Sequence, residues 1–148
     1  MASSAQLHRD NESGREHFHL DLATDVAQIK HVVEAVEACC FAGRAASSRA
    51  RFRLCTVVAE AVANAMVYGN GNDPARRVRV EVELHDEHVV IGVTDEGAGF
   101  DPSAIPDPTD DEALESECGR GIFMIRQLAD VVVFNEHGNT IWMTLPRC

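Results

Sequence analysis

The chain has 148 residues, of which 45% are hydrophobic, and this suits one domain with a single core. Its 24 acidic and 13 basic residues give a net charge of −11, which argues against a general binder of nucleic acid or of anionic membranes, because both select basic proteins. An anionic ligand would therefore be held by backbone dipoles and a metal ion rather than by a basic patch.

The sequence favours a protein of the cytoplasm. Its first residues are polar, without the apolar region of a signal peptide, and no apolar run approaches the roughly 20 residues that cross a bilayer. The five cysteines are odd in number and include no C-x-x-C pair, so they favour neither a disulfide framework nor a zinc site. We therefore expect a reduced, cytoplasmic protein.

The N-terminal part predicts a strand and two helices after a tail. Residues 1–15 are polar and are expected to be disordered, so that residues 16–148 make up the domain. Alternating hydrophobic residues at the start of the domain indicate a strand. Helical apolar spacing then predicts helices at about residues 25–41, capped by Thr24, and at about residues 48–68.

The rest of the domain predicts a hairpin, a loop, a helix and two strands. Alternating hydrophobic residues at 78–84 and 89–93 form the hairpin. Residues 100–118 hold three prolines and an acidic cluster, and so long a loop is usually a lid, a binding segment or disorder. A helix follows Gly119, and two strands end the chain. This order predicts an α+β fold, a two-layer α/β sandwich with helices on one face of a mostly antiparallel sheet.

Common nucleotide-binding and catalytic motifs are absent from the sequence. The single lysine, Lys30, follows no glycine-rich loop, so there is no P-loop. The H-R-D and D-F-G elements of eukaryotic-type protein kinases and the G-x-S-x-G elbow of hydrolases are also missing. Any nucleotide chemistry therefore needs another way to hold phosphate.

Two polar residues interrupt the apolar run of the second helix. Glu60 and Asn64 lie one helical turn apart, about 40° around the axis, at the edge of the apolar arc. A carboxylate in that place can act as a general base, and an amide oxygen can ligate Mg²⁺. The alternative is that both side chains only cap neighbouring loops.

A glycine motif follows the strand predicted at 89–93. In DEGAGFDP, Asp95 begins where that strand ends, and it can accept a hydrogen bond from an exocyclic amine. Gly97 and Gly99 would let the backbone approach a flat ligand closely. An ordinary glycine-rich turn is the alternative.

A second glycine motif, CGRGIFMIRQLAD, opens the next predicted helix. Gly119 and Gly121 give that helix a backbone with free N–H groups and the positive end of a dipole, which suits phosphate. Arg120 could add a charge-assisted contact. The alternative is a loop-to-helix junction that needs glycine only for its turn.

The order of these motifs resembles a known family. The chain holds, in succession, EAVANAMVYGN, D-x-G-x-G, a long loop, a G-x-G helix start and a late G-x-T that ends in Thr140. From about residue 16 to residue 146 it resembles the GHKL superfamily of ATPases, which have the Bergerat fold. EAVANAMVYGN and GRGIFMI look most like the bacterial anti-sigma factor serine/threonine kinases.

The resemblance implies a site for ATP and Mg²⁺. It makes Glu60 the general base, Asn64 the Mg²⁺ ligand and Asp95 the acceptor of the adenine amine. The other residues that it implies in nucleotide binding are Gly97, Gly99, Gly119, Arg120, Gly121 and Thr140. The loop at 100–118 would be the ATP lid, and this set of groups provides the positioning and charge stabilisation that phosphoryl transfer needs.

The resemblance also implies protein partners. The family phosphorylates a serine or threonine on a small anti-sigma factor antagonist of the STAS type, binds a sigma factor, and commonly forms homodimers. Competition between the two protein ligands gives partner switching. This sequence departs from the pattern at Tyr68 and Gly69, where relatives often show a histidine followed by glycine, and in its acidic lid. The identity of the partners stays open.

Two other functions fit parts of the pattern. A non-catalytic ATP-binding switch protein would sequester a regulatory partner without needing a base, so Glu60 favours the enzyme. A detached sensor histidine-kinase domain would need a phosphoacceptor histidine on a dimerisation helix. The residues around His31 lack the acidic-arginine-proline context of that motif, which argues against this function.

Overall fold

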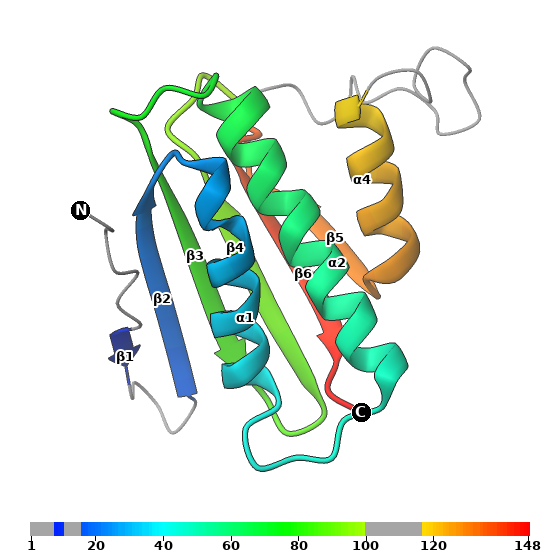
Figure 1. Cartoon of the computed structure of the whole chain (residues 1–148). Coiled ribbons are helices and arrows are strands. Elements are labelled where there is room, and N and C mark those ends of the chain that lie inside the picture. The colour runs from blue at the N-terminus through cyan, green and yellow to red at the C-terminus, as the bar shows by residue number, and fades with distance from the viewer. Residues whose placement is uncertain (1–7, 11–15, 100–116) are drawn as a thin grey trace.

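The computed structural model describes residues 8–10, 16–99 and 117–148, which form one sheet with helices packed on one face (Figure 1). The strands are β1 (His8–Asp10), β2 (Glu16–Ala23), β3 (Arg77–Leu84), β4 (His88–Thr94), β5 (Val131–Phe134) and β6 (Thr140–Pro146). The helical segments are the 3₁₀ turn η1 (Val26–Gln28), α1 (Ile29–Cys40), α2 (Ser48–Asn64), the π-helical turn η2 (Ala65–Gly69) and α4 (Glu117–Leu128).

Within the described residues, the sheet has six strands in the order β1-β2-β3-β4-β6-β5, and every neighbouring pair is antiparallel. Helices α1, α2 and α4 lie side by side over one face (Figure 1). The predicted two-layer α+β sandwich is therefore confirmed. None of these helices is long and apolar enough to cross a membrane.

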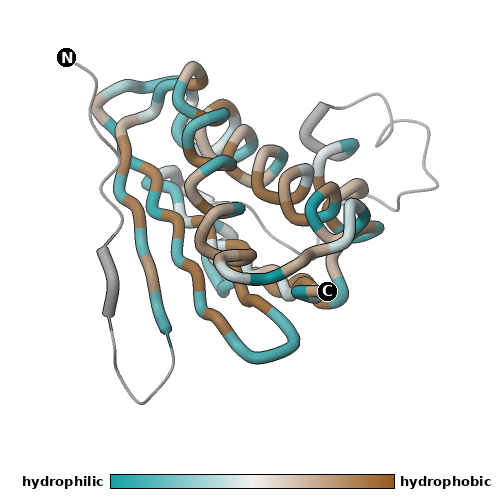
Figure 2. The backbone as a smooth tube through the Cα atoms, turned by 60° about the horizontal axis from the view of Figure 1, so that its bottom comes forward, coloured by the Kyte–Doolittle hydropathy of each residue, from teal (hydrophilic) through white to brown (hydrophobic). Residues whose placement is uncertain are grey.

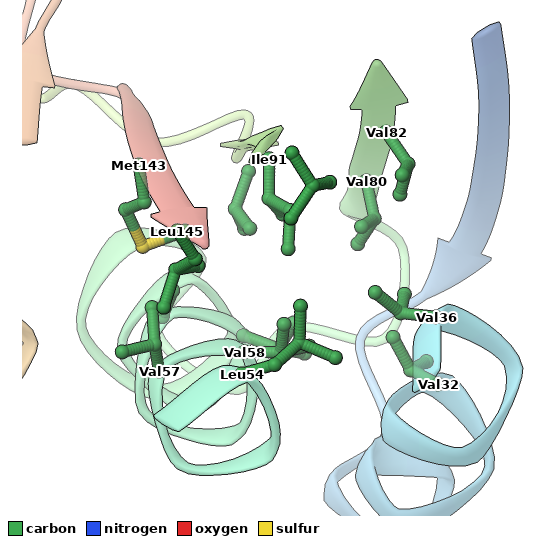
Figure 3. Packing of buried hydrophobic residues seen from close by; sticks show 14 of the residues in the cluster. Val32, Val36, Leu54, Val57, Val58, Val80, Val82, Ile91, Met143 and Leu145 are labelled. Carbon is green, nitrogen blue, oxygen red and sulfur yellow. The ribbon is translucent and has the colours of Figure 1, made fainter. Parts of the chain in front are cut away.

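The core lies between the helices and the sheet. Hydrophobic and hydrophilic residues alternate along β3 (Figure 2), and its hydrophobic residues are the buried ones, as expected of a strand with one face on the core. Figure 3 shows these side chains meeting those of α1 and α2. The fully buried members drawn there include Val32, Val36, Leu54, Val57, Val58, Val80, Ile91, Met143 and Leu145.

The short strand β1 lies in the segment that was expected to be disordered. His8–Asp10 pair with β2, from His8 opposite His19 to Asp10 opposite His17. Without that pairing, β2 would present a row of unsatisfied backbone N–H and C=O groups at the sheet edge, which an extended segment can pair with. The structure differs from the expectation at these residues. The rest of the tail lies outside the described residues, and the division of the chain at residue 15 stays a prediction.

The cap of the first helix also differs from the prediction. The Asp25 carboxylate, not the Thr24 hydroxyl, accepts a hydrogen bond from the Ala27 N–H, at 3.0 Å. Thr24 is buried, and its hydroxyl donates instead to the Arg76 carbonyl at 2.8 Å. A buried threonine hydroxyl needs a hydrogen-bond partner, and the partner of Thr24 lies 52 residues further along the chain.

Asn70 ties the end of η2 to the sheet and to the loop after β4. It is 1% exposed. Its Nδ2 donates to the Thr24 Oγ1 at 2.9 Å and to the Arg77 carbonyl at 3.0 Å, while its Oδ1 accepts from the Glu96 N–H at 2.8 Å. One buried amide therefore fixes three segments that are distant in sequence.

Replacing Asn70 with alanine is expected to lower the free energy of unfolding by about 2–4 kcal/mol, because buried hydrogen-bonding groups lose their partner. Urea denaturation measures this change. Asp86→Ala, in the exposed turn between β3 and β4, is the control and should stay within about 0.5 kcal/mol of the wild type. An Asn70→Ala protein as stable as the control would contradict the structural role of this amide.

Candidate functional site

A cavity of about 360 Å³ opens where α2, η2 and α4 meet the ends of β4 and β6, and small-molecule sites have volumes of roughly 300–1,000 Å³. Its lining residues are Ala61, Asn64, Ala65, Tyr68, Gly69, Arg76, Val93, Asp95, Ala98, Gly99, Ile122, Ile125, Phe134, Gly138, Asn139, Thr140 and Ile141. Most of this lining is apolar, and a few polar groups stand among it, which is the usual composition of a site that orients a ligand.

On the helical side of the cavity, α2 carries Glu60 and Asn64 toward α4. Both side chains are partly exposed, and Asn64 lines the cavity. A Cβ atom added to Gly121 would lie 3.0 Å from the Glu60 Oε2 and 3.1 Å from the Asn64 Nδ2. Glycine at this position therefore lets the backbone of α4 reach both side chains. The structure therefore places the acid and the amide of α2 beside the first turns of α4.

The glycine motif of α4 lies inside the helix rather than before it. The helix begins at Glu117, so the prediction that it follows Gly119 is wrong by a little under one turn. The N–H groups in the first turn of a helix have no partner within it, and among the described residues of α4 these belong to residues 117–119. Gly119 and Arg120 thus lie at the free end of the helix, and Arg120 is exposed. Gly121 is buried and contributes space beside α2.

At the other end of the cavity, Asp95 follows β4 and is held from two sides. The Gly97 N–H donates to the Asp95 Oδ1 at 2.8 Å. The Asp95 N–H donates to the Asn139 carbonyl at 2.9 Å, and the Asn139 Nδ2 donates to the Asp95 carbonyl at 3.2 Å. Burial raises the pKa of the Asp95 carboxyl, while the Gly97 N–H and the Arg76 charge act in the opposite direction.

Two glycines make room for this carboxylate. A Cβ atom on Gly69 would overlap the Asp95 carboxylate, and one on Gly97 would overlap the Gly69 carbonyl oxygen. Gly97 therefore packs behind Asp95 and does not line the cavity. Gly69 was not predicted as a site residue, because a glycine after a helical pattern normally indicates only the end of the helix.

The turn between β5 and β6 completes the cavity. Gly99 has a φ of +78°, and a Cβ atom there would overlap the His137 carbonyl oxygen. Thr140 lines the cavity, and its Oγ1 lies 2.9 Å from the Thr94 Oγ1. Gly99 and Thr140, which are 41 positions apart in the sequence, therefore line the same cavity.

An asparagine pair shapes this turn, and sequence reasoning missed it. The Asn135 Oδ1 accepts from the Asn139 N–H at 3.0 Å and the Thr140 N–H at 3.2 Å. The Asn135 Nδ2 donates to the Asn139 Oδ1 at 2.6 Å. Since Asn139 also binds the backbone of Asp95, the pair joins the turn to the acid. In sequence, these residues show only the polar composition of an ordinary turn.

The fold and the site together define a class of protein. A family model described as the histidine kinase-like ATPase domain matches residues 21–145. The chain therefore belongs to the histidine kinase-like ATPase family, within the GHKL superfamily. This confirms the resemblance seen in its motifs.

Individual relatives refine this classification. The chain is 35% identical over 95 residues to an anti-sigma F factor of Oceanobacillus iheyensis, across 60% of this chain and 64% of the relative. It is 32% identical over 99 residues to the anti-sigma F factor of Geobacillus stearothermophilus, across 63% and 67%. It is 29% identical over 94 residues to the serine-protein kinase RsbW of Oceanobacillus iheyensis, across 59% and 60%. The match thus spans a little under two thirds of the first relative's length, and it groups this chain with the anti-sigma factor kinases.

Proposed function

We propose that this protein is an ATP-dependent serine/threonine protein kinase and anti-sigma factor. In this proposal it phosphorylates a STAS-type anti-sigma factor antagonist and sequesters a sigma factor. The proposal is supported mainly by the position of Glu60. The Glu60 carboxylate lies beside Asn64 and Gly121 of α4, next to a cavity whose far end holds Asp95.

Asp95 is the proposed residue that recognises adenine by hydrogen bonding. Its Oδ1 already accepts one hydrogen bond, and a carboxylate has further acceptor capacity for the exocyclic amine of the base. Apolar side chains of the lining, among them Ile125 and Phe134, would cover the faces of a flat ring. The proposed neighbours of the base are Gly97 behind Asp95, and Gly99 and Thr140 in the lining.

The free end of α4 is the proposed phosphate site. The N–H groups of its first turn and its dipole would attract an anion, and Arg120 at this end would add positive charge. Gly119 and Gly121 leave two positions at this end of the helix without a side chain. Asn64 would hold Mg²⁺ through its amide oxygen, and the ion, when bound, would supply positive charge to the phosphate oxygens.

Glu60 is the proposed general base. Its carboxylate would accept the proton of a substrate serine or threonine hydroxyl as that oxygen attacks the terminal phosphorus of ATP, and ADP would leave. Its place fits this role, because Glu60 and Asn64 both adjoin Gly121 near the free end of α4. A protein that only bound ATP would have less use for a carboxylate there.

The proposed partners come from the relatives, which are named as anti-sigma F factors and as a serine-protein kinase. A sigma factor and its antagonist would compete for this protein in the cytoplasm, and the nucleotide would bias the competition. A homodimer is the proposed assembly.

The test is incubation of the full chain with labelled ATP, Mg²⁺ and candidate STAS proteins. Label on a serine or threonine of one candidate, together with binding of a sigma factor measured separately, is the expected result. Firm ATP binding without transfer to any candidate would replace the kinase with the second function, an ATP-binding switch protein. A protein that binds no ATP would contradict both.

A further inference from the structure

Arg76 lies in the cavity and has no part in the function proposed above. Among the described residues of the lining, it is the one cation, and Asp95 is the one anion. The chain as a whole carries a net charge of −11, so a basic side chain beside this acid is not a general property of its surface. The sequence motifs gave no signal for it, because ARRVR indicates only the start of a strand.

The backbone of Arg76 is anchored to a buried residue. Its carbonyl accepts hydrogen bonds from both the Thr24 N–H, at 3.0 Å, and the Thr24 hydroxyl, at 2.8 Å. Its own N–H donates to the Asp73 carbonyl at 3.0 Å. Because Thr24 is only 5% exposed, the point from which the Arg76 side chain starts is fixed.

The side chain of Arg76 is tethered at one edge. Its Nε lies 3.8 Å from the Asp73 Oδ2, and the Ala75 N–H holds the other carboxylate oxygen of Asp73 at 2.9 Å. The ion pair is half exposed and contributes little energy by itself. Arg76 itself lines the cavity, and so does Asp95.

We propose that Arg76 is the positioning residue of Asp95: its guanidinium lines the same cavity as this acid and complements the charge of the carboxylate that accepts the amine of an aminopurine base. The inference rests on the proposed nucleotide site and deepens it. A protonated carboxyl offers its own O–H toward the ligand and loses the charge that strengthens the bond to the amine.

Other groups around Asp95 do not replace this charge in the described part of the chain. On its own loop, Glu96 is exposed and its carboxylate accepts from the Arg77 N–H. From the turn between β5 and β6, the neutral amide of Asn139 meets the Asp95 backbone, and His137 of that turn is exposed.

Among the described residues, the helices contribute no cation to the lining of the cavity. Gly69 of η2, which touches the Asp95 carboxylate most closely, has no side chain. The α2 groups nearest the cavity are the neutral Asn64 and the acidic Glu60. The hydrogen bond from the Gly97 N–H opposes the effect of burial on the pKa of Asp95, and Arg76 adds the one positive charge that does so.

The test compares Arg76→Gln with Arg77→Gln. Both remove one positive charge from an exposed side chain, but Arg77 does not line the cavity, and its hydrogen bonds to Asn70 and Glu96 use its backbone. The first readout is the pKa of the Asp95 carboxyl in nucleotide-free protein, measured by NMR titration of its side-chain carbon. Arg76→Gln should raise this pKa by roughly 0.5–1 unit, the size expected for the loss of one partly screened charge. Arg77→Gln should not, and Arg76→Lys should restore most of the wild-type value.

The second readout is ATP affinity between about pH 4 and pH 8, a range that brackets the ordinary and raised pKa values of a carboxyl. The pH at which affinity falls by half should move upward in Arg76→Gln by the same amount as the pKa of Asp95. An unchanged pKa in Arg76→Gln would overturn the inference. So would an affinity loss that is equal at every pH, since that result means direct contact between Arg76 and the ligand. If wild-type protein bound no ATP, the proposed function would fail, and the NMR titration would still decide the role of Arg76.

Discussion

Asp95→Asn is expected to weaken ATP binding roughly 100-fold while the protein stays folded, because a charge-assisted hydrogen bond is replaced by a donor facing a donor. In the wild type, the Gly97 N–H donates to the Asp95 Oδ1 at 2.8 Å, and this donor determines how the asparagine side chain is oriented. The amide oxygen must accept from Gly97, so the amide NH₂ takes the remaining position. That group cannot accept a hydrogen bond from the adenine amine.

The same reasoning predicts a change of base preference. A 6-oxopurine presents a carbonyl where adenine presents an amine, and the NH₂ group that Asp95→Asn introduces can donate a hydrogen bond to that carbonyl. Titration of Asp95→Asn with ATP and with ITP measures this, and ITP should bind the variant more tightly than ATP does. Equal losses for both nucleotides would mean that Asp95 supports the loop without reading the base.

The stability of the Asp95→Asn variant separates this effect from unfolding. Burial raises the pKa of the Asp95 carboxyl above its ordinary value. A carboxyl with a raised pKa favours the folded state most below its ordinary pKa, and this contribution is lost as the pH rises through the raised value. At about pH 7 the ionised acid therefore does not stabilise the fold, and the neutral amide should unfold at an equal or higher urea concentration. A variant that is strongly destabilised under these conditions would contradict this account of the carboxyl.

The elements of this fold follow from local patterns, whereas several contacts that shape the site do not. The strand alternation and the helical spacing are properties of neighbouring residues, and they predict the order of the elements correctly after residue 16. The edge pairing of β1 escaped prediction because His8–Asp10 carry no apolar alternation, and only the open edge of β2 gives them a partner.

Gly69 has one role that the sequence predicts and a second role at the site that it does not predict. As a residue after a helical pattern, it predicts a helix stop, and η2 does end there. Its second role depends on Asp95, 26 positions later in the numbering, whose carboxylate fills the space where a side chain would be. The same holds for Arg76, because its backbone is held by a hydrogen bond from Thr24, which lies 52 positions earlier in the chain. Such contacts depend on the assembled fold and leave no periodic signal in the sequence.

Glu60→Gln is expected to lower phosphoryl transfer to the substrate protein by about 10²- to 10⁴-fold, the usual loss when a general base is removed. ATP affinity should not change, since the proposed base acts on the substrate hydroxyl and not on the nucleotide. Glutamine keeps the size and shape of the side chain beside Gly121, so the packing of α2 against α4 is preserved. Single-turnover transfer from labelled ATP, with binding measured in parallel, gives both quantities.

The control for Glu60→Gln is Glu34→Gln on α1, which removes an equally charged group from an exposed helix face, where Glu34 pairs with Lys30 at 4.0 Å. It should transfer phosphate at the wild-type rate. If Glu60→Gln did so too, Glu60 would not be the base. If it lost ATP binding along with transfer, Glu60 would belong to the nucleotide site. Only a loss of transfer with intact binding distinguishes a kinase that uses this carboxylate from an ATP-dependent switch, because both would share the same cavity, the same Asp95 and the same α4 N-terminus.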